Sequence, residues 1–166
     1  LQKYLKDLWE YSRDPSFYEY LEYEPISSFE ECKRYFSNTL SSIANKEGML
    51  WIIVLKNESK AIGTIRLAYW DLNRLITKIG YGISLNYGRK GYFSEALLCI
   101  IKYTFDILGF YRIESWTRYD NYASIKGLEN IGFINEGCLR NYYLGFDGKR
   151  LDVILYSIIK EDYVNF

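Results

Sequence analysis

The chain of 166 residues contains no histidine. This absence excludes Ser–His and Cys–His catalytic pairs and the histidine-containing ligand sets that commonly bind zinc. We therefore expect no metal and no metal catalysis, which leaves direct group transfer open. Long apolar runs are also missing, since none approaches the roughly 18 residues of a membrane span, and no signal-peptide pattern opens the chain. The protein is expected to have no membrane partner.

Neither sign of charge is in excess, because 21 lysine and arginine residues balance 21 aspartate and glutamate residues. Such a chain has no broad basic surface for nucleic acid, so we expect no nucleic-acid partner. Cysteine is scarce, and Cys32, Cys99 and Cys138 are widely spaced within apolar patterns. We expect them to be reduced residues of the core in a cytoplasmic protein.

The apolar content of 49% suits one α/β domain over residues 1–166. Hydrophobic periodicity predicts helices over residues 2–11, 28–43, 94–108 and 122–130, and strands over residues 50–55, 61–70, 76–85 and 112–118. Ser28-Phe29-Glu30-Glu31 is typical of a capping box, while Gly48 and Gly109 are expected to end helices. The predicted buried faces of the two longer helices comprise Phe29, Cys32, Phe36, Leu40 and Ile43, and Leu97, Ile100, Ile101, Thr104, Phe105 and Leu108.

A glycine-containing basic loop follows the strand Ile79–Leu85 and precedes a helix that opens at Ser94. In Tyr87-Gly88-Arg89-Lys90-Gly91-Tyr92-Phe93, unpaired backbone amides and the positive end of the helix dipole converge, and Arg89 and Lys90 add charge. This pattern can bind a phosphate-bearing cofactor, but taken alone it is equally typical of a polar turn that caps a helix. Its glycine spacing matches neither a P-loop nor a Rossmann fingerprint.

Several motifs in order narrow the interpretation. They are Gly88-Arg89-Lys90-Gly91-Tyr92-Phe93-Ser94-Glu95-Ala96, Arg112-Ile113-Glu114, Asn121-Tyr122-Ala123-Ser124 and Glu129-Asn130-Ile131-Gly132-Phe133. Together they resemble the GNAT superfamily of acetyl-CoA-dependent N-acetyltransferases, most closely the subgroup of ribosomal-protein N-terminal acetyltransferases. The resemblance extends over nearly the whole chain through Trp9, Asp14-Pro15, Glu136-Gly137-Cys138-Leu139-Arg140, Phe146-Asp147-Gly148-Lys149 and Asp152-Val153-Ile154-Leu155-Tyr156-Ser157.

The resemblance implies a GNAT fold, in which helices flank a mixed, mostly antiparallel central sheet. Two parallel strands of that sheet splay apart, and here they would be Ile79–Leu85 and Arg112–Arg118. The family's first strand should precede the helix at Leu1–Tyr11, so we expect the chain to lack it. Edge strands in this architecture often pair between subunits, which leaves a homodimer open.

The resemblance also implies a site for acetyl-CoA as cosubstrate. Ile83 would offer backbone hydrogen bonds to the pantetheine arm, and Trp116 would lie near the wedge. Asn121 would bond the pantetheine, and Ser124 would protonate the departing thiolate. The alternative is that Asp120, Asn121 and Ser124 only cap a helix. The pyrophosphate would be held by the backbone amides of Arg89, Lys90, Gly91, Tyr92, Phe93 and Ser94.

The chain departs from the family at positions that affect function. Phe93 replaces a small residue and Gly88 a polar one, which predicts weaker cofactor affinity. Lys78 occupies a strand position where some relatives carry an acid, and Tyr143 lies where others have a glutamate. No general base is therefore assigned, and a water chain could accept the proton.

The family's acceptor groove corresponds here to residues from the amino-terminal region and the last strand pair. Carboxylates beside aromatic rings would suit a cationic amine, but solvated glutamates and locally packed tyrosines are an equal alternative. The residues of this groove are Trp9, Tyr20, Glu22, Tyr23, Glu24, Asn141, Tyr142 and Tyr143.

The resulting hypothesis is an N-acetyltransferase that transfers acetyl from acetyl-CoA to a primary amine by direct attack in a ternary complex. The acceptor would be a small amine, an amino sugar or a protein amino terminus. One alternative is a non-catalytic acetyl-CoA-binding or interaction module with the same fold. Another is an α/β domain whose loop binds a different nucleotide.

Overall fold

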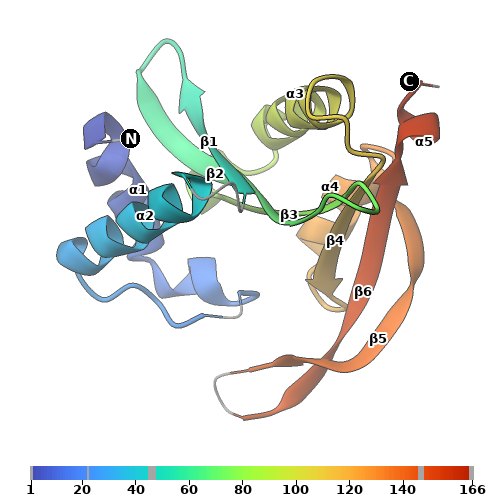
Figure 1. The fold of residues 1–166 in the computed structure, drawn as a ribbon. Coiled ribbons are helices and arrows are strands. Elements are labelled where there is room, and N and C mark those ends of the chain that lie inside the picture. The colour runs from blue at the N-terminus through green and yellow to red at the C-terminus, as the bar shows by residue number, and fades with distance from the viewer. Residues whose placement is uncertain (1, 22, 45–47, 146–147, 165–166) are drawn as a thin grey trace.

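The computed structural model describes residues 2–21, 23–44, 48–145 and 148–164. Within them, six strands form one sheet in the order β1-β2-β3-β4-β6-β5 (Figure 1). The pairs are antiparallel except β3 with β4, which is parallel. The strand bounds are β1 (Gly48–Leu55), β2 (Lys60–Asp71), β3 (Ile76–Ile83), β4 (Arg112–Arg118), β5 (Ile134–Leu144) and β6 (Arg150–Ile159). This mixed α/β sheet confirms the predicted fold class.

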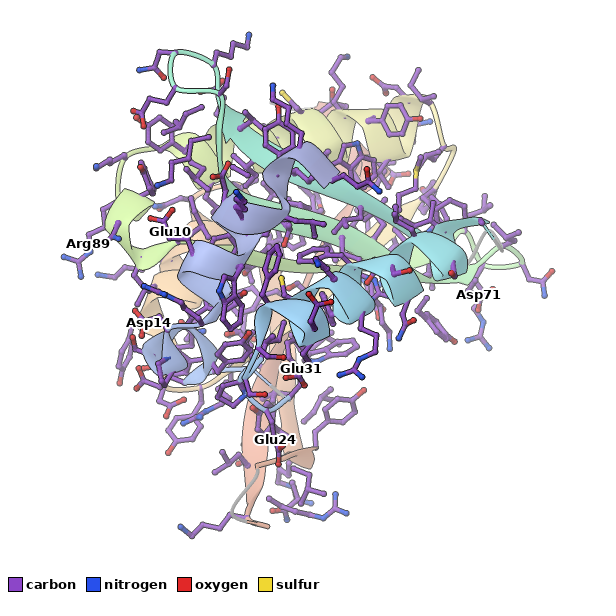
Figure 2. All side chains as sticks on the ribbon, turned by 90° about the vertical axis from the view of Figure 1, so that its left-hand side faces the viewer. Glu10, Asp14, Glu24, Glu31, Asp71 and Arg89 are labelled. Carbon is purple, nitrogen blue, oxygen red and sulfur yellow. The ribbon has the colours of Figure 1, made fainter. Side chains whose placement is uncertain are left out.

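Helices cover both faces of the sheet. The α-helices are α1 (Leu5–Ser12), α2 (Phe29–Ala44), α3 (Tyr92–Asp106), α4 (Tyr122–Glu129) and α5 (Lys160–Val164), and short 3₁₀ helices are η1 (Gln2–Tyr4), η2 (Pro15–Tyr18) and η3 (Leu85–Tyr87). Helices α1 and α2 pack on one face through a core that includes Leu8, Cys32 and Phe36, and they stand in front of the sheet in Figure 2. The larger core lies on the other face, against α3 and α4. Among the described residues, no helix is long and apolar enough to cross a membrane.

The sheet opens between its two parallel strands. β3 and β4 pair over three positions, Ile76 with Arg112, Thr77 with Ile113 and Lys78 with Glu114. Beyond this point β3 continues against β2 and β4 continues against β6, so the two strands diverge. The predicted wedge between parallel strands is therefore confirmed.

Burial on the helices follows the predicted stripes with some corrections. Leu97, Ile100, Ile101, Thr104 and Phe105 of α3 are buried as expected. Leu40 was expected in the core but is 47% exposed, because the buried stripe of α2 continues from Phe36 to Thr39.

The assignment of all three cysteines to the core is wrong for two of them. Cys32 is buried, whereas Cys99 and Cys138 are exposed. Cys99 lies off the buried stripe of α3, which passes through positions 97, 100, 101, 104 and 105. Cys138 lies on β5, whose residues are mostly exposed. Apolar neighbours in the sequence therefore did not identify the buried face.

Several predicted boundaries moved. Gly48 is the first residue of β1, and not a helix end; α2 is described to Ala44, and residues 45–47 lie outside the described residues. β3 ends at Ile83, because Leu85 already belongs to η3. The capping box is half formed: Ser28 Oγ accepts from Glu31 N at 3.2 Å, but the Glu31 carboxylate accepts from Ser27.

Candidate active site

The basic loop places bare backbone amides at the start of α3. Gly91 is the N-cap of this helix with φ 81°, and it supplies no side-chain hydrogen bond to the first turn. A Cβ at Gly91 would meet nothing within 4 Å, so the backbone there is open to an incoming group. Arg89 also has a positive φ, 60°, and its exposed side chain extends away from the ribbon (Figure 2). Unpaired amides, the helix dipole and a nearby cation together suit a pyrophosphate.

Phe93 does not lie over the loop. Its ring packs on Tyr81 with centroids 4.5 Å apart, and its edge lies 3.3 Å from where a Cβ of Gly127 in α4 would be. The side chain therefore fills the space between the sheet, α3 and α4. The helix begins at Tyr92, two residues before the predicted opening at Ser94, which places Tyr92, Phe93 and Ser94 in its first turn.

The wedge edge of β3 carries Ile83. Successive residues of a strand direct their backbone groups to opposite edges. Ser84 N donates to Ile62 O of β2 at 2.7 Å, so the backbone groups of Ile83 point away from β2, toward the wedge. Ile79 has the same orientation, since its carbonyl accepts from Ser115 Oγ of β4 at 3.4 Å. This edge fits the backbone contacts that the family resemblance implies for Ile83.

Asn121 and Ser124 meet at the start of α4. Asn121 is the N-cap of this helix, and its Oδ1 accepts from Ser124 N at 3.1 Å. Asn121 therefore does cap the helix, as the alternative interpretation expected. Because its Oδ1 is used in the cap, the amide Nδ2 is the group that could contact a ligand. Asp120 is occupied elsewhere, because its carboxylate accepts from Arg118 Nε at 3.0 Å.

Ser124 has a partner that sequence reasoning missed. Its Oγ lies 2.7 Å from Tyr81 Oη, and either oxygen can donate. Burial of the phenol is the main cause that raises the pKa of Tyr81 to about 12, so Tyr81 remains protonated at neutral pH. The sequence did contain one indication of this partner, because Tyr81 stands between Gly80 and Gly82 on the strand predicted to border the wedge.

A cavity of about 710 Å³ passes through the opening between β3 and β4. It reaches Tyr81, Asn121 and Ser124 on the α4 side of the sheet and continues to the side covered by α1 and α2. A volume of this size is typical of sites for small molecules. Its tyrosines are Tyr11, Tyr18, Tyr20, Tyr23, Tyr35, Tyr69, Tyr81, Tyr142 and Tyr143.

Lys78 and Tyr143, which stand where some relatives carry acidic residues, both form other contacts. Lys78 lies at the vertex of the wedge, with Nζ 4.2 Å from the ring centroid of Trp116. Trp116 also packs edge-on against Tyr142, at 5.6 Å. Tyr143 is buried, and its Oη donates to the carbonyl of Leu21. None of these groups is placed as a free base.

The structure brings together part of the predicted acceptor groove. Tyr20, Tyr23, Tyr142 and Tyr143 line the cavity, whereas Trp9, Glu24 and Asn141 are not among its lining residues. Trp9 packs near Phe29, and Glu24 is exposed. Glu22 and the turn residues Phe146 and Asp147 lie outside the described residues.

The opened sheet, the unpaired amides at the start of α3 and the cavity suit a group-transfer enzyme with an extended phosphate-bearing cosubstrate. A family model described as the acetyltransferase (GNAT) domain matches residues 2–134. The chain belongs to this family and is an acetyl-CoA-dependent N-acetyltransferase by class.

Known proteins resemble the chain over most of its length. The uncharacterized N-acetyltransferase p20 of Bacillus licheniformis is 29% identical over 156 residues, which cover 94% of this chain and 87% of that protein. Spermidine N-acetyltransferase from Vibrio cholerae, solved with CoA and spermine, has a TM-score of 0.83 at 20% identity and covers 97% of this chain and 92% of its own.

A ribosomal-protein-S5-alanine acetyltransferase from Vibrio fischeri has a TM-score of 0.74 at 23% identity, with 95% of this chain and 91% of that chain covered. At such identities the likeness to both solved structures is one of fold. The ribosomal subgroup therefore stays a prediction.

Proposed function

We propose that this protein transfers an acetyl group from acetyl-CoA to a primary amine by direct attack in a ternary complex. The observation that carries the proposal is the continuity of the site. The opening between β3 and β4 joins the cavity to the Ser124–Tyr81 pair. The loop with the bare amides of α3 follows β3 in the chain after η3, and its residues Arg89 to Ser94 are not among the cavity-lining residues.

The loop and the wedge would bind the cosubstrate. Backbone amides from Arg89 to Ser94 would hold the pyrophosphate, with Arg89 and Lys90 adding charge. Ile83 would hydrogen-bond the pantetheine arm, and Asn121 Nδ2 would donate to it while Asn121 Oδ1 keeps its cap on Ser124 N. Such positioning places the thioester carbonyl within the cavity and so lowers the entropic part of the barrier.

Ser124 and Tyr81 would act on the leaving group as a unit. As the amine forms the C–N bond and the C–S bond breaks, Ser124 Oγ donates its proton to the sulfur. Tyr81, which its raised pKa keeps protonated, then passes the proton of its Oη to Ser124 Oγ, and the water that accepts the amine proton returns one to Tyr81, so the net transfer is from the amine to the sulfur. A positioned acid of this kind commonly contributes about 10²- to 10⁴-fold in rate.

The amine must react in its neutral form. An alkylamine with a pKa near 10 is neutral in roughly one molecule per thousand at pH 7, which is sufficient for a reaction that needs no strong base. We therefore assign no protein side chain as general base, and we propose that water accepts the amine proton.

Calorimetric titration with acetyl-CoA tests the binding step. We expect saturable binding by the wild type and its loss in Gly91→Glu, which fills the open space at the helix start with a negative charge. Gly109→Glu is the matched control, because Gly109 has a similar φ of 74° and open space around it but lies away from the loop. Equal binding by both variants would contradict the assigned cofactor site.

Turnover decides between an enzyme and a binding module. Release of CoA in the presence of an amine panel, with formation of the acetylated amine by mass spectrometry, supports the proposal. Binding of acetyl-CoA without transfer to any amine would favour the non-catalytic alternative. The cytoplasmic location, the single-domain organisation, the lack of a metal and the homodimer stay predictions.

A further inference from the structure

The charged residues that line the cavity, within the described part of the chain, are all basic: Arg66, Lys78 and Arg118. A site built for a purely cationic amine would be expected to offer carboxylates. The described lining offers cations and tyrosines. Of the two carboxylates expected beside the aromatic rings, Glu24 is not among the lining residues and Glu22 lies outside the described residues, so that expectation stays a prediction.

Arg66 and Lys78 face the cavity from adjacent strands. In the antiparallel ladder of β2 and β3, Lys78 lies opposite Ala68, and Arg66 lies opposite Gly80. Residues two apart along a strand share a face, so Arg66 and Lys78 are diagonal neighbours on the side covered by α1 and α2. Such neighbours are separated by roughly 7–8 Å, a spacing that a single carboxylate or phosphate can bridge.

Neither cation has a counter-ion among the described residues. Both side chains are half-buried, yet neither forms an ion pair with another described residue. The acidic residue opposite Lys78 on β4 is Glu114, and its carboxylate accepts from Arg112 Nε at 2.8 Å. Partial burial of unpaired charges is costly, which favours a ligand that supplies the missing negative charge.

Arg118 differs from this pair. Its guanidinium donates to the carboxylate of Asp120 and, at 2.8 Å, to the carbonyl of Glu19. Its charge is therefore already balanced within the protein. The unbalanced positive charge of the described lining belongs to Arg66 and Lys78.

The local backbone holds Lys78 in place. The ladder of β2 and β3 is irregular between Ala68 and Asp71, and Tyr69 has a positive φ of 55°. This bulge directs the Tyr69 ring toward the cavity, with its centroid 4.5 Å from Lys78 Nζ. Trp116 contacts the same ammonium at 4.2 Å. Two aromatic contacts thus fix a cation at the vertex of the wedge.

We infer that the acceptor is a primary amine that also carries a carboxylate or phosphate group, and that Arg66 and Lys78 bind that group. The inference rests on the proposed acetyl transfer and names the class of its second substrate. The anion docks on β2 and β3, and the amino group extends along the cavity toward the thioester beside Ser124. The tyrosines of the lining then surround the remainder of the acceptor.

Matched acceptors test the inference through kcat/KM for CoA release by the full chain, calculated per concentration of neutral amine because the anionic group also raises the pKa of the amine. L-phenylalanine is compared with L-phenylalaninamide to test a carboxylate, and O-phosphoethanolamine is compared with ethanolamine to test a phosphate. Spermidine is included as an acceptor that carries only positive charge. We expect the anionic member of at least one pair to be preferred by about tenfold or more, since a charge-assisted contact is worth that much.

Arg66→Met and Lys78→Met should each reduce the preferred ratio of anionic to neutral acceptor by about tenfold. Arg74→Met is the control, because Arg74 is 75% exposed at its side chain and is not among the cavity-lining residues. A ratio that stays the same in both cavity variants, or equal kcat/KM for anionic and neutral members, overturns the inference and leaves acetyl transfer intact.

A direct binding measurement covers the case in which no amine is acetylated. The same pairs are titrated calorimetrically into the protein saturated with CoA. Tighter binding of the anionic member, weakened in Arg66→Met, supports the anion site even though acetyl transfer would then have failed. Equal affinity within each pair, or tighter binding of spermidine than of both anions, refutes it.

Discussion

Tyr81 Oη and Ser124 Oγ lie 2.7 Å apart across the wedge, although the two residues are 43 positions apart in the chain. Tyr81 is on β3 and Ser124 on α4, so the contact connects the two sides of the opening. Phe93 packs on the Tyr81 ring and holds it there. The two hydroxyls are therefore already in contact, as the proposed relay to the leaving sulfur requires.

We expect Ser124→Ala to lower kcat by about 100-fold, because it removes the group that donates to the leaving sulfur, with KM for acetyl-CoA changed less than about threefold. Tyr81→Phe should lower kcat by about tenfold and leave the fold intact, since it removes one oxygen. Steady-state kinetics measure both. Tyr119→Phe, at an exposed tyrosine outside the cavity, is the control. A Tyr81→Phe enzyme with wild-type kcat would refute the relay.

Substitutions at Asn121 separate helix capping from cofactor binding. Asn121→Ala should reduce the free energy of unfolding by about 1 kcal/mol through loss of the cap, and should also weaken acetyl-CoA binding. Asn121→Asp keeps an acceptor for Ser124 N but loses the amide donor, so it should retain stability and still bind acetyl-CoA about tenfold more weakly. Thermal unfolding and calorimetry measure the two effects. If Asn121→Asp binds acetyl-CoA normally, Asn121 is only a cap.

Phe93→Ala distinguishes a blocking residue from a packing residue. The sequence predicted that Phe93 weakens cofactor affinity, in which case its removal should tighten acetyl-CoA binding. Its ring instead contacts Tyr81 and faces Gly127. We expect a loss of about 3 kcal/mol in the free energy of unfolding and no gain in affinity. A tighter Kd for acetyl-CoA in a folded Phe93→Ala protein would restore the original prediction.

The order of elements could be predicted because it depends on local patterns. Arg112–Arg118 alternates buried and half-buried residues, and β4 has the predicted bounds. The motif spacing placed Asn121 and Ser124 at a helix start, where they lie. These features need only periodicity and capping chemistry.

Features that depend on tertiary contacts could not be predicted in the same way. The Tyr81–Ser124 contact arises from the packing of α4 against β3. The Tyr69 ring faces Lys78 because Tyr69 lies in a bulge with a positive φ. The sequence has no glycine at this position that would have indicated such a backbone. That Arg66 and Lys78 have no counter-ion among the described residues became visible only once their neighbours were known.

Arg89 has a strained backbone conformation, and its positive charge is proposed to assist acetyl-CoA binding. Its φ of 60° lies in the left-handed region, which glycine adopts without a steric penalty. Arg89→Gly should therefore raise the free energy of unfolding by up to about 1 kcal/mol. The same change should weaken acetyl-CoA binding a few-fold and make it less sensitive to salt, because a cation beside the proposed pyrophosphate site is lost. Arg89→Lys keeps the charge and should bind as the wild type does; weak binding by both variants would contradict a purely electrostatic role.

The ion pair of Glu136 with Arg112 leads us to expect that the free energy of unfolding decreases at acid pH. The Arg112 guanidinium donates to its carboxylate and holds the pKa of Glu136 at about 2, below the ordinary value of 4.5, while Ser157 Oγ donates to it at 2.7 Å. A carboxyl with a depressed pKa stabilises the folded state above pH 4.5, and this stabilisation is lost as the pH falls toward 2.

Glu136→Gln should therefore cost about 1 kcal/mol or less at pH 7, because the side chain is partly exposed, and should flatten the decline in unfolding free energy below pH 4.5. Urea unfolding at a series of pH values measures both effects. Glu58→Gln, at an exposed glutamate in the β1–β2 turn, is the control and should decline as the wild type does. If Glu136→Gln loses stability as steeply as the wild type between pH 4.5 and 2, the Arg112–Glu136 pair is not the source of acid sensitivity.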